Sequence, residues 1–190
     1  GRWLGLLEGH HFHQYKTGIT SDMELAEMLG TVHLGTSAYL RLAFKNTPRG
    51  ASQTAENGDV LIWAHHGHGS AQTPGAVLNK LQRVSARWEG DIFIMGHAHT
   101  KESTIIDRVI PVWNEPHRLA HRSVVLACTG GFLKGYVEHS RDGLVPRGTY
   151  VEQGMMPPVA LGGMLFKITP RWHQGKFHRR VWLPDIRVES

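Results

Sequence analysis

The chain has 190 residues, of which 41% are hydrophobic and 19% are charged, a composition typical of one soluble globular domain over residues 1–190. No run approaches the roughly 18 apolar residues of a membrane span, and no segment resembles a signal peptide, so we expect a cytoplasmic protein that does not enter a membrane. The formal net charge of +5 is compatible with an anionic substrate or with nucleic acid, although the scattered basic residues favour a solvated basic surface.

The first two elements are predicted from short patterns near the amino terminus. Residues 2–9 (RWLGLLEG) predict a strand. Residues 21–30 (SDMELAEMLG) predict a helix, because Ser21 and Glu24 have the spacing of a capping box and Gly30 is a stop signal.

A strand–helix–strand unit is predicted next. Residues 59–65 (DVLIWAH) and 91–96 (DIFIMG) are short apolar runs typical of buried strands. Residues 73–90 between them predict a helix, with Thr73 as its cap and Pro74 in its first turn. Its expected apolar stripe comprises Val77, Leu78, Leu81, Val84 and Trp88. Two strands joined by a helix predict a parallel pair with a right-handed crossover.

The second half of the chain lacks comparable helical patterns. Strands are predicted at residues 103–113, 122–130, 162–168 and 176–183. We expect them to form antiparallel strands of a second sheet, with a Gly- and Pro-rich loop over residues 141–158. Cys128 lies in an apolar run and is predicted to be a buried strand residue, and a single cysteine excludes an internal disulfide.

Histidine is unusually frequent, with 14 residues, and three predicted strand ends carry it. The segments are GHHFH at residues 9–13, HHGHG at residues 65–69 and GHAH at residues 96–99. Neutral imidazole is a common metal ligand, and the carboxyl ends of strands are where α/β sheets bind ligands. The three segments therefore predict a divalent-metal site. The alternative is that each histidine only closes its own turn.

The ordered set of three motifs resembles the calcineurin-like metallophosphoesterases, in particular phage-type members. In that family a Gly-Asn-His motif, a later histidine and a Gly-His-x-His motif help to hold two divalent metals that hydrolyse phosphate esters. The resemblance covers residues 4–100 well and the later strands more loosely. It implies an α/β fold, namely a truncated metallophosphoesterase-like two-sheet β-sandwich flanked by helices.

The resemblance also implies roles for individual histidines. The implied metal ligands are His10, His65 or His66, His97 and His99. His97 would bind one metal and His99 the other, and His10 occupies the position of the family's metal-binding asparagine. His11 matches the family's catalytic histidine, which protonates the leaving group or stabilises charge in the transition state.

The chain also departs from the family pattern. The Asp-x-His and Gly-Asp-x-x-Asp motifs, whose carboxylates bind and bridge the metals, do not precede residue 9, and Phe12 replaces an acidic residue. We expect either the carboxyl-terminal piece of a longer enzyme or a shortened protein with a rebuilt site. A site of His10, His66 and His97 would favour one or two transition metals such as Zn²⁺, Mn²⁺ or Fe²⁺ over Mg²⁺. Further candidates for a second metal or a second shell are Glu8, His13, His68 and His99.

The implied function is hydrolysis of a phosphate ester, more probably a diester, by a metal-bound hydroxide, with His11 assisting the leaving group. An alternative is a non-catalytic metal- or nucleic-acid-binding remnant of a phage metallophosphoesterase. A weaker alternative is a metallo-β-lactamase-like pair at His66 and His68. The expected partners are a phosphate-ester substrate, with nucleic acid and a homo-oligomer as further possibilities.

Overall fold

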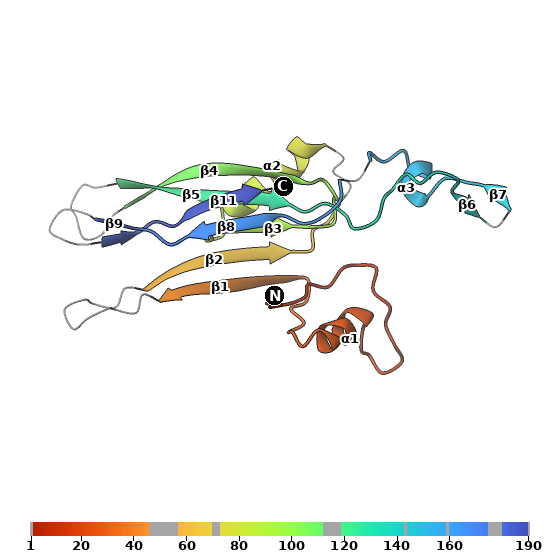
Figure 1. The fold of residues 1–190 in the computed structure, drawn as a ribbon, viewed down its shortest axis with the longest axis horizontal. Coiled ribbons are helices and arrows are strands. Elements are labelled where there is room, and N and C mark those ends of the chain that lie inside the picture. The colour runs from red at the N-terminus through yellow and green to blue at the C-terminus, as the bar shows by residue number, and fades with distance from the viewer. Residues whose placement is uncertain are drawn as a thin grey trace.

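A five-stranded mixed sheet forms the centre of this mixed α/β structure, a computed structural model with few helices (Figure 1). The structure describes residues 2–45, 57–69, 73–111, 119–142, 144–158, 160–174 and 180–189. The strands are β1 (Ser37–Lys45), β2 (Asn57–His65), β3 (Ile92–Met95), β4 (Glu102–Pro111) and β5 (Leu119–Cys128). Their order across the sheet is β1-β2-β3-β5-β4.

Three parallel strands lie at the middle of this sheet. β2 pairs in parallel with β3, and β3 pairs in parallel with β5, whereas β1 and β4 are antiparallel edge strands. The helix α2 (Pro74–Ser85) connects β2 to β3, so the predicted parallel strand–helix–strand unit is confirmed. The arrowheads of β2 and β5 point toward the same end of the sheet (Figure 1). Segments that follow the parallel strands therefore begin at one edge.

Helix α2 covers one face of the sheet. Thr73 is its N-cap in an extended conformation and Pro74 is its first residue, as predicted. Val77 and Leu81 are fully buried against a cluster that comprises Trp63, Phe93, Met95, Val124, Leu126 and Cys128. The helix ends at Ser85, so Trp88 lies beyond it and is 49% exposed. Trp88 therefore does not belong to the helical stripe in which the sequence placed it.

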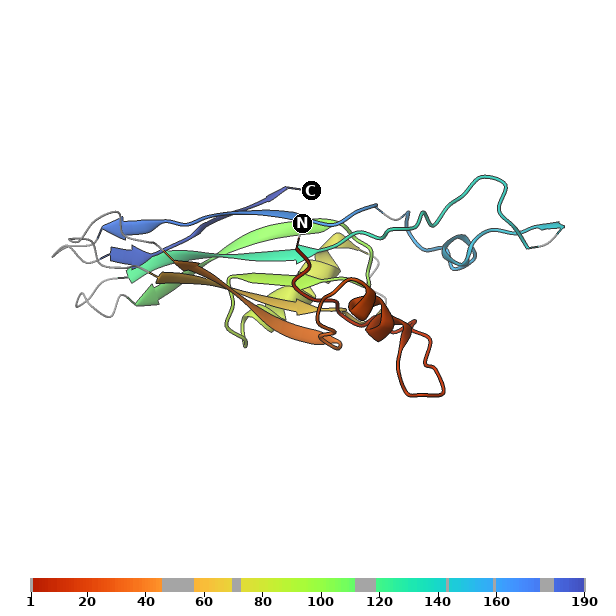
Figure 2. The same cartoon turned by 60° about the horizontal axis from the view of Figure 1, so that its bottom comes forward.

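A second, smaller sheet covers the opposite face (Figure 2). The strands β8 (Leu165–Thr169) and β11 (Asp185–Glu189) form an antiparallel pair, and β9 (Trp172–Gln174) pairs with β10 (Arg180–Trp182). Ile186 is buried in a cluster with Val60, Ile62, Ile92 and Val125. This cluster fills the space between the two sheets.

The prediction that the later strands all belong to a second sheet was wrong. β4 and β5 are part of the first sheet, and β5 is one of its central strands. The last five residues of β5, 124–128, are all buried. Such a continuous apolar run is typical of a strand that is covered on both faces. Residues 112–113 and 176–179 of the predicted strands lie outside the described residues.

The amino-terminal segment differs from its predicted structure. Residues 2–9 form no strand, and Leu6 makes only an isolated bridge with His33. Helix α1 (Ser21–Met28) is capped by Thr20, whose Oγ1 accepts a hydrogen bond from the Met23 N–H at 3.2 Å. Ser21 is therefore the first helical residue and not the cap of a capping box. β1, with alternating exposed and half-buried residues, was not predicted.

Residues 132–142 and 144–158 extend away from both sheets (Figures 1 and 2). The predicted loop over residues 141–158 contains three short elements, namely β6 (Arg141–Asp142), β7 (Val145–Pro146) and α3 (Tyr150–Gln153). Several large apolar side chains of this arm are exposed, including Phe132, Leu133, Leu144 and Met155. Among the described residues, no helix has the length and apolar character needed to cross a membrane.

The carboxylate of Asp91, which is 1% exposed, connects all three parallel strands. Asp91 immediately precedes β3. Its Oδ2 accepts a hydrogen bond from the Leu61 N–H of β2 at 2.9 Å. Its Oδ1 accepts one from Arg122 Nε of β5 at 2.7 Å, and Arg122 Nη2 lies 2.5 Å from the same oxygen. The carboxylate therefore has both a backbone donor and a cation in the interior.

Replacing Arg122 by alanine is expected to destabilise the protein, because it leaves a buried carboxylate without its cation. Fully buried pairs lose about 3–5 kcal/mol in this way. Since the Arg122 side chain is itself 37% exposed, we expect a loss of about 2 kcal/mol, measured by urea unfolding. The matched control is Arg41→Ala, which breaks the solvent-screened, exposed pair with Asp59 and should cost clearly less stability. Equal losses in the two variants would contradict this role of Asp91.

Candidate metal centre

Three of the predicted ligands, His10, His66 and His97, lie together. Each offers one ring nitrogen, and the three nitrogens lie within 4.8 Å of one another. His10 Nδ1 is 2.9 Å from His66 Nε2. His66 follows β2 directly and His97 follows β3 after one residue, whereas His10 lies in the loop before α1. The three-histidine group therefore joins the amino-terminal loop to the carboxyl edge of the parallel strands.

Glycines allow the turns after β2 and β3 to approach each other closely. Gly67 has a φ of +101°, and a Cβ at this position would lie 2.8 Å from the carbonyl oxygen of Gly96 and 2.9 Å from the Cβ of His97. A Cβ on Gly96 would lie 3.2 Å from the carbonyl oxygen of His66. Only glycine fits position 67, because any side chain would push the two histidine-bearing turns apart.

The turn after β3 contains strained backbone. His97 has a φ of +64° and His99 a φ of +54°. This left-handed region is unfavourable for residues with a side chain, at a cost on the order of 1 kcal/mol or more for each residue. Such conformations persist where the surrounding structure determines them, and they cluster at functional sites.

The environment of the group favours neutral imidazoles. Burial lowers the pKa of His66 and the pKa of His97 from the ordinary value of 6.5, and nearby histidines, His10 first among them, lower both further. The charge of Asp22 opposes this effect at His66, and a hydrogen bond to the Gly69 backbone opposes it at His97. Both rings are consequently neutral near pH 7, which is the form that binds metals.

His65 and His99 lie outside the three-histidine group. The Nδ1 of His65 accepts a hydrogen bond from the Gly67 N–H at 2.7 Å, and its ring stacks on Trp63 with the centroids 5.4 Å apart. The sequence left the middle ligand open between His65 and its neighbour His66. The structure places His66 in the group. Successive side chains along a strand alternate between its two sides, so His65 lies on the side of Trp63 and His66 lies on the other.

The remaining histidine candidates lie around the group. His11 is exposed, and its ring centroid is 4.0 Å from that of His10. The exposed ring of His68 is nearly parallel to that of His97 at 6.4 Å. His13 contacts Tyr15, with the ring centroids 4.9 Å apart.

Glu8 was named above as a candidate ligand of a second metal or as a residue behind the ligands, but it contacts other partners. Its Oε2 accepts a hydrogen bond from Thr20 Oγ1 at 3.2 Å and lies 3.3 Å from Nε2 of the half-buried His33. Glu8 therefore connects the amino-terminal segment to the start of α1 and is not a member of the three-histidine group.

Asp22 is a neighbour of the group that sequence reasoning missed. Its Oδ2 accepts a hydrogen bond from the Gly9 N–H at 3.0 Å, and its charge raises the pKa of His66. In sequence, Asp22 is only an acidic residue in the first turn of a helix, where acidic residues are favoured by the helix dipole. No pattern in the chain separates it from Glu24 in the same turn.

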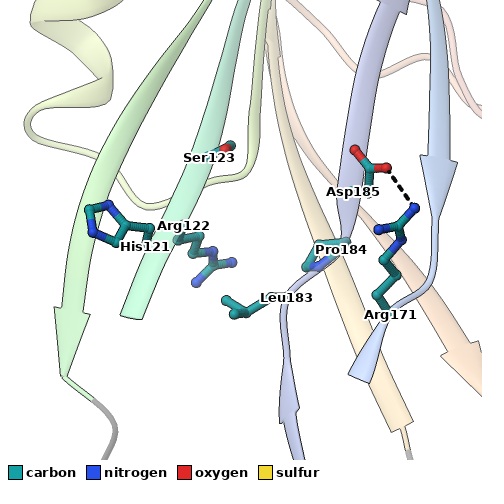
Figure 3. Close-up of a pocket in the computed structure, with 7 residues that line it drawn as sticks. All are labelled: His121, Arg122, Ser123, Arg171, Leu183, Pro184 and Asp185. Atoms are coloured by element: carbon teal, nitrogen blue, oxygen red, sulfur yellow. Dashed lines mark ion pairs between the residues drawn. The ribbon is translucent and has the colours of Figure 1, made fainter. Parts of the chain in front are cut away.

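A cavity of about 230 Å³ lies elsewhere, between β5 and the segments around β9 and β11 (Figure 3). It is lined by His121, Arg122, Ser123, Arg171, Leu183, Pro184 and Asp185. The cations in its wall already have acidic partners, since Arg171 pairs with Asp185 at 3.2 Å and Arg122 pairs with Asp91. None of the three clustered histidines lines this cavity.

No family model, no curated protein and no solved structure matches this chain. The likeness to the calcineurin-like metallophosphoesterases therefore depends on the three histidine motifs and their order.

In the absence of metal, stability is expected to decrease as the pH falls below about 6.5. The pKa of His66 and that of His97 are lower in the folded chain than in the unfolded chain, so the unfolded chain takes up protons first and is favoured at acidic pH. The measurement is urea unfolding with EDTA at about pH 7.5 and about pH 5.5.

The variant His66→Gln should reduce this loss of stability between the two pH values. The exposed His121→Gln serves as the control and should retain the full loss. An identical pH dependence in His66→Gln and the wild type would contradict the shifted pKa.

Proposed function

We propose that this protein is a metal-dependent hydrolase of phosphate esters, most readily a phosphodiesterase. In this proposal His10, His66 and His97 hold a divalent transition metal. The observation that carries the proposal is the convergence of their three ring nitrogens within 4.8 Å at the carboxyl edge of parallel strands. Ligands bind at this edge in open α/β sheets.

The donor set fits a transition metal. Three neutral imidazole nitrogens suit Zn²⁺, Mn²⁺ or Fe²⁺ better than Mg²⁺, which prefers oxygen ligands. Zinc enzymes commonly use three protein ligands and leave one position open. Because His10 is exposed while His66 and His97 are half-buried, the open side of the group faces solvent. A bound metal ion supplies a Lewis acid that polarises phosphoryl oxygens and lowers the pKa of water.

His11 is the proposed general acid. Its imidazole lies beside His10, with ring centroids 4.0 Å apart, and is exposed to solvent. An imidazole can give a proton at neutral pH, so this side chain can protonate the leaving-group oxygen of an ester that approaches from solvent. The net charge of +5 favours the approach of an anionic ester.

The proposed family and fold follow from the same motifs. We infer a relative of the calcineurin-like metallophosphoesterases, with the five-stranded sheet and the small second sheet as its two layers. Helix α2 lies outside the first layer. His99, which the resemblance would assign to a second metal, lies apart from the group, so the arrangement favours one metal.

A non-catalytic metal- or nucleic-acid-binding remnant is the second candidate function. Among the described residues, the metal-ligand group contains three histidines and no carboxylate. The family uses carboxylates to bridge two metals, and their absence from this group favours metal binding without turnover. Zinc binding without hydrolysis of any phosphodiester would support this candidate over the enzyme.

The variant His66→Ala should lose both metal and activity, because it removes one of three ligands. We expect the Zn²⁺ affinity to fall by at least about 100-fold, measured by chelator competition, with hydrolysis of a nitrophenyl phosphodiester lost in parallel. His65→Ala is the matched control one residue away, and it should retain metal and activity. If His66→Ala retained both bound metal and turnover, this result would contradict the proposed metal centre.

The variant His11→Gln should affect catalysis and leave metal affinity unchanged. Loss of a general acid typically costs about 10²–10⁴-fold in rate. The loss should be large for an alkyl leaving group, which needs a proton, and small for nitrophenolate, which does not. The kcat values for the two ester types provide the test, with His13→Gln as the control. An equal loss for both leaving groups would argue against proton donation by His11.

A further inference from the structure

We propose that Asp22 is a positioning residue of the metal centre, holding the loop that carries His10 beside the His66 imidazole. This inference rests on the proposed metal centre and deepens it, because it assigns a role to a carboxylate that does not bind the metal itself.

The first contact of Asp22 fixes the loop before α1. Its Oδ2 accepts a hydrogen bond from the Gly9 N–H at 3.0 Å, and Gly9 directly precedes His10. Asp22 lies in the first turn of α1, whose N-cap Thr20 is buried. The carboxylate therefore connects the loop of His10 to the start of a helix with a defined cap.

Gly9, which Asp22 holds through this hydrogen bond, also borders the His66 imidazole. A Cβ on Gly9 would lie 3.4 Å from Cε1 and 3.8 Å from Nδ1 of His66, and 4.0 Å from Oδ2 of Asp22. The ring and the carboxylate thus border the same space, which Gly9 leaves free of any side chain. Since Nε2 of His66 lies 2.9 Å from His10, Nδ1 is the nitrogen on the side of Gly9.

A negative charge near a metal-binding imidazole increases the basicity of its nitrogens. The charge of Asp22 acts on His66 in this direction, because it raises the pKa of the imidazole against the effects of burial. Asp22 is the only described carboxylate that shifts the pKa of His66 or His97.

Stabilisation of the helix end alone would not distinguish Asp22 from its neighbour Glu24. Both residues lie in the first turn of α1, where a negative charge interacts favourably with the helix dipole. Glu24, however, accepts a hydrogen bond from the Tyr15 hydroxyl at 2.8 Å and does not shift the pKa of either buried histidine of the group. The two acidic residues therefore form a matched pair for an experiment.

Three variants of the full chain separate the possible roles. Asp22→Asn keeps an oxygen that can accept the Gly9 hydrogen bond but removes the charge beside His66. Asp22→Ala removes both, and Glu24→Gln removes a charge from the same helical turn without touching the centre. The measurements are Zn²⁺ affinity by chelator competition and the visible absorption spectrum of the Co²⁺-loaded protein, with folding checked by urea unfolding.

We expect Asp22→Asn to weaken Zn²⁺ binding by about 10-fold and Asp22→Ala by about 100-fold. Both should shift the Co²⁺ absorption bands, because the ligand field at His66 changes, whereas Glu24→Gln should match the wild type in affinity and spectrum. Wild-type affinity and an unchanged spectrum in Asp22→Ala would overturn the role of Asp22 while leaving the metal centre intact. An equal loss in Glu24→Gln would also overturn it. A wild-type chain that binds neither ion would overturn both the centre and this inference.

Discussion

The parallel alignment of β2, β3 and β5 is the constraint on which the rest of the structure depends. The buried carboxylate of Asp91 contacts all three strands through the Leu61 N–H and the Arg122 guanidinium. Parallel strands end at a common edge, so the turns after β2 and β3 begin side by side. Gly67 then allows the two turns to touch. The positions of His66 and His97 follow from these contacts before any ligand is considered.

Much of this arrangement can be predicted from the sequence, because short-range patterns determine it. Two short apolar runs, the Thr73 cap and Pro74 define the strand–helix–strand unit, which the structure confirms. The ends of its two strands carry histidines, and parallel pairing is sufficient to predict that they meet. Residues with no such pattern were misplaced. β5 lies between β3 and β4 in the sheet. Its continuous apolar run predicts a buried strand, but the run alone does not determine which strands are its neighbours.

The finer features of the candidate site depend on three-dimensional approach and could not be read from residue order. The choice between His65 and His66 depends on which side of β2 the loop of His10 reaches, because the end of this strand places one ring over Trp63 and the other beside His10. The contact between Asp22 and Gly9 brings together residues 13 positions apart in sequence. In the same way, the separation of Glu8 from the site depends on its contacts with Thr20 and His33.

The separation of His10 from His66 along the chain has a mechanical consequence. These two residues are 56 positions apart, and His10 belongs to a segment whose backbone pairs with the residues before β1, as in the bridge between Leu6 and His33. A metal bound by both would act as a cross-link that closes this long loop, comparable to a disulfide of the same span, which is worth about 4 kcal/mol in loop-closure entropy. Metal binding would then also link the amino-terminal segment to the sheet. The link would protect this segment from local unfolding and proteolysis.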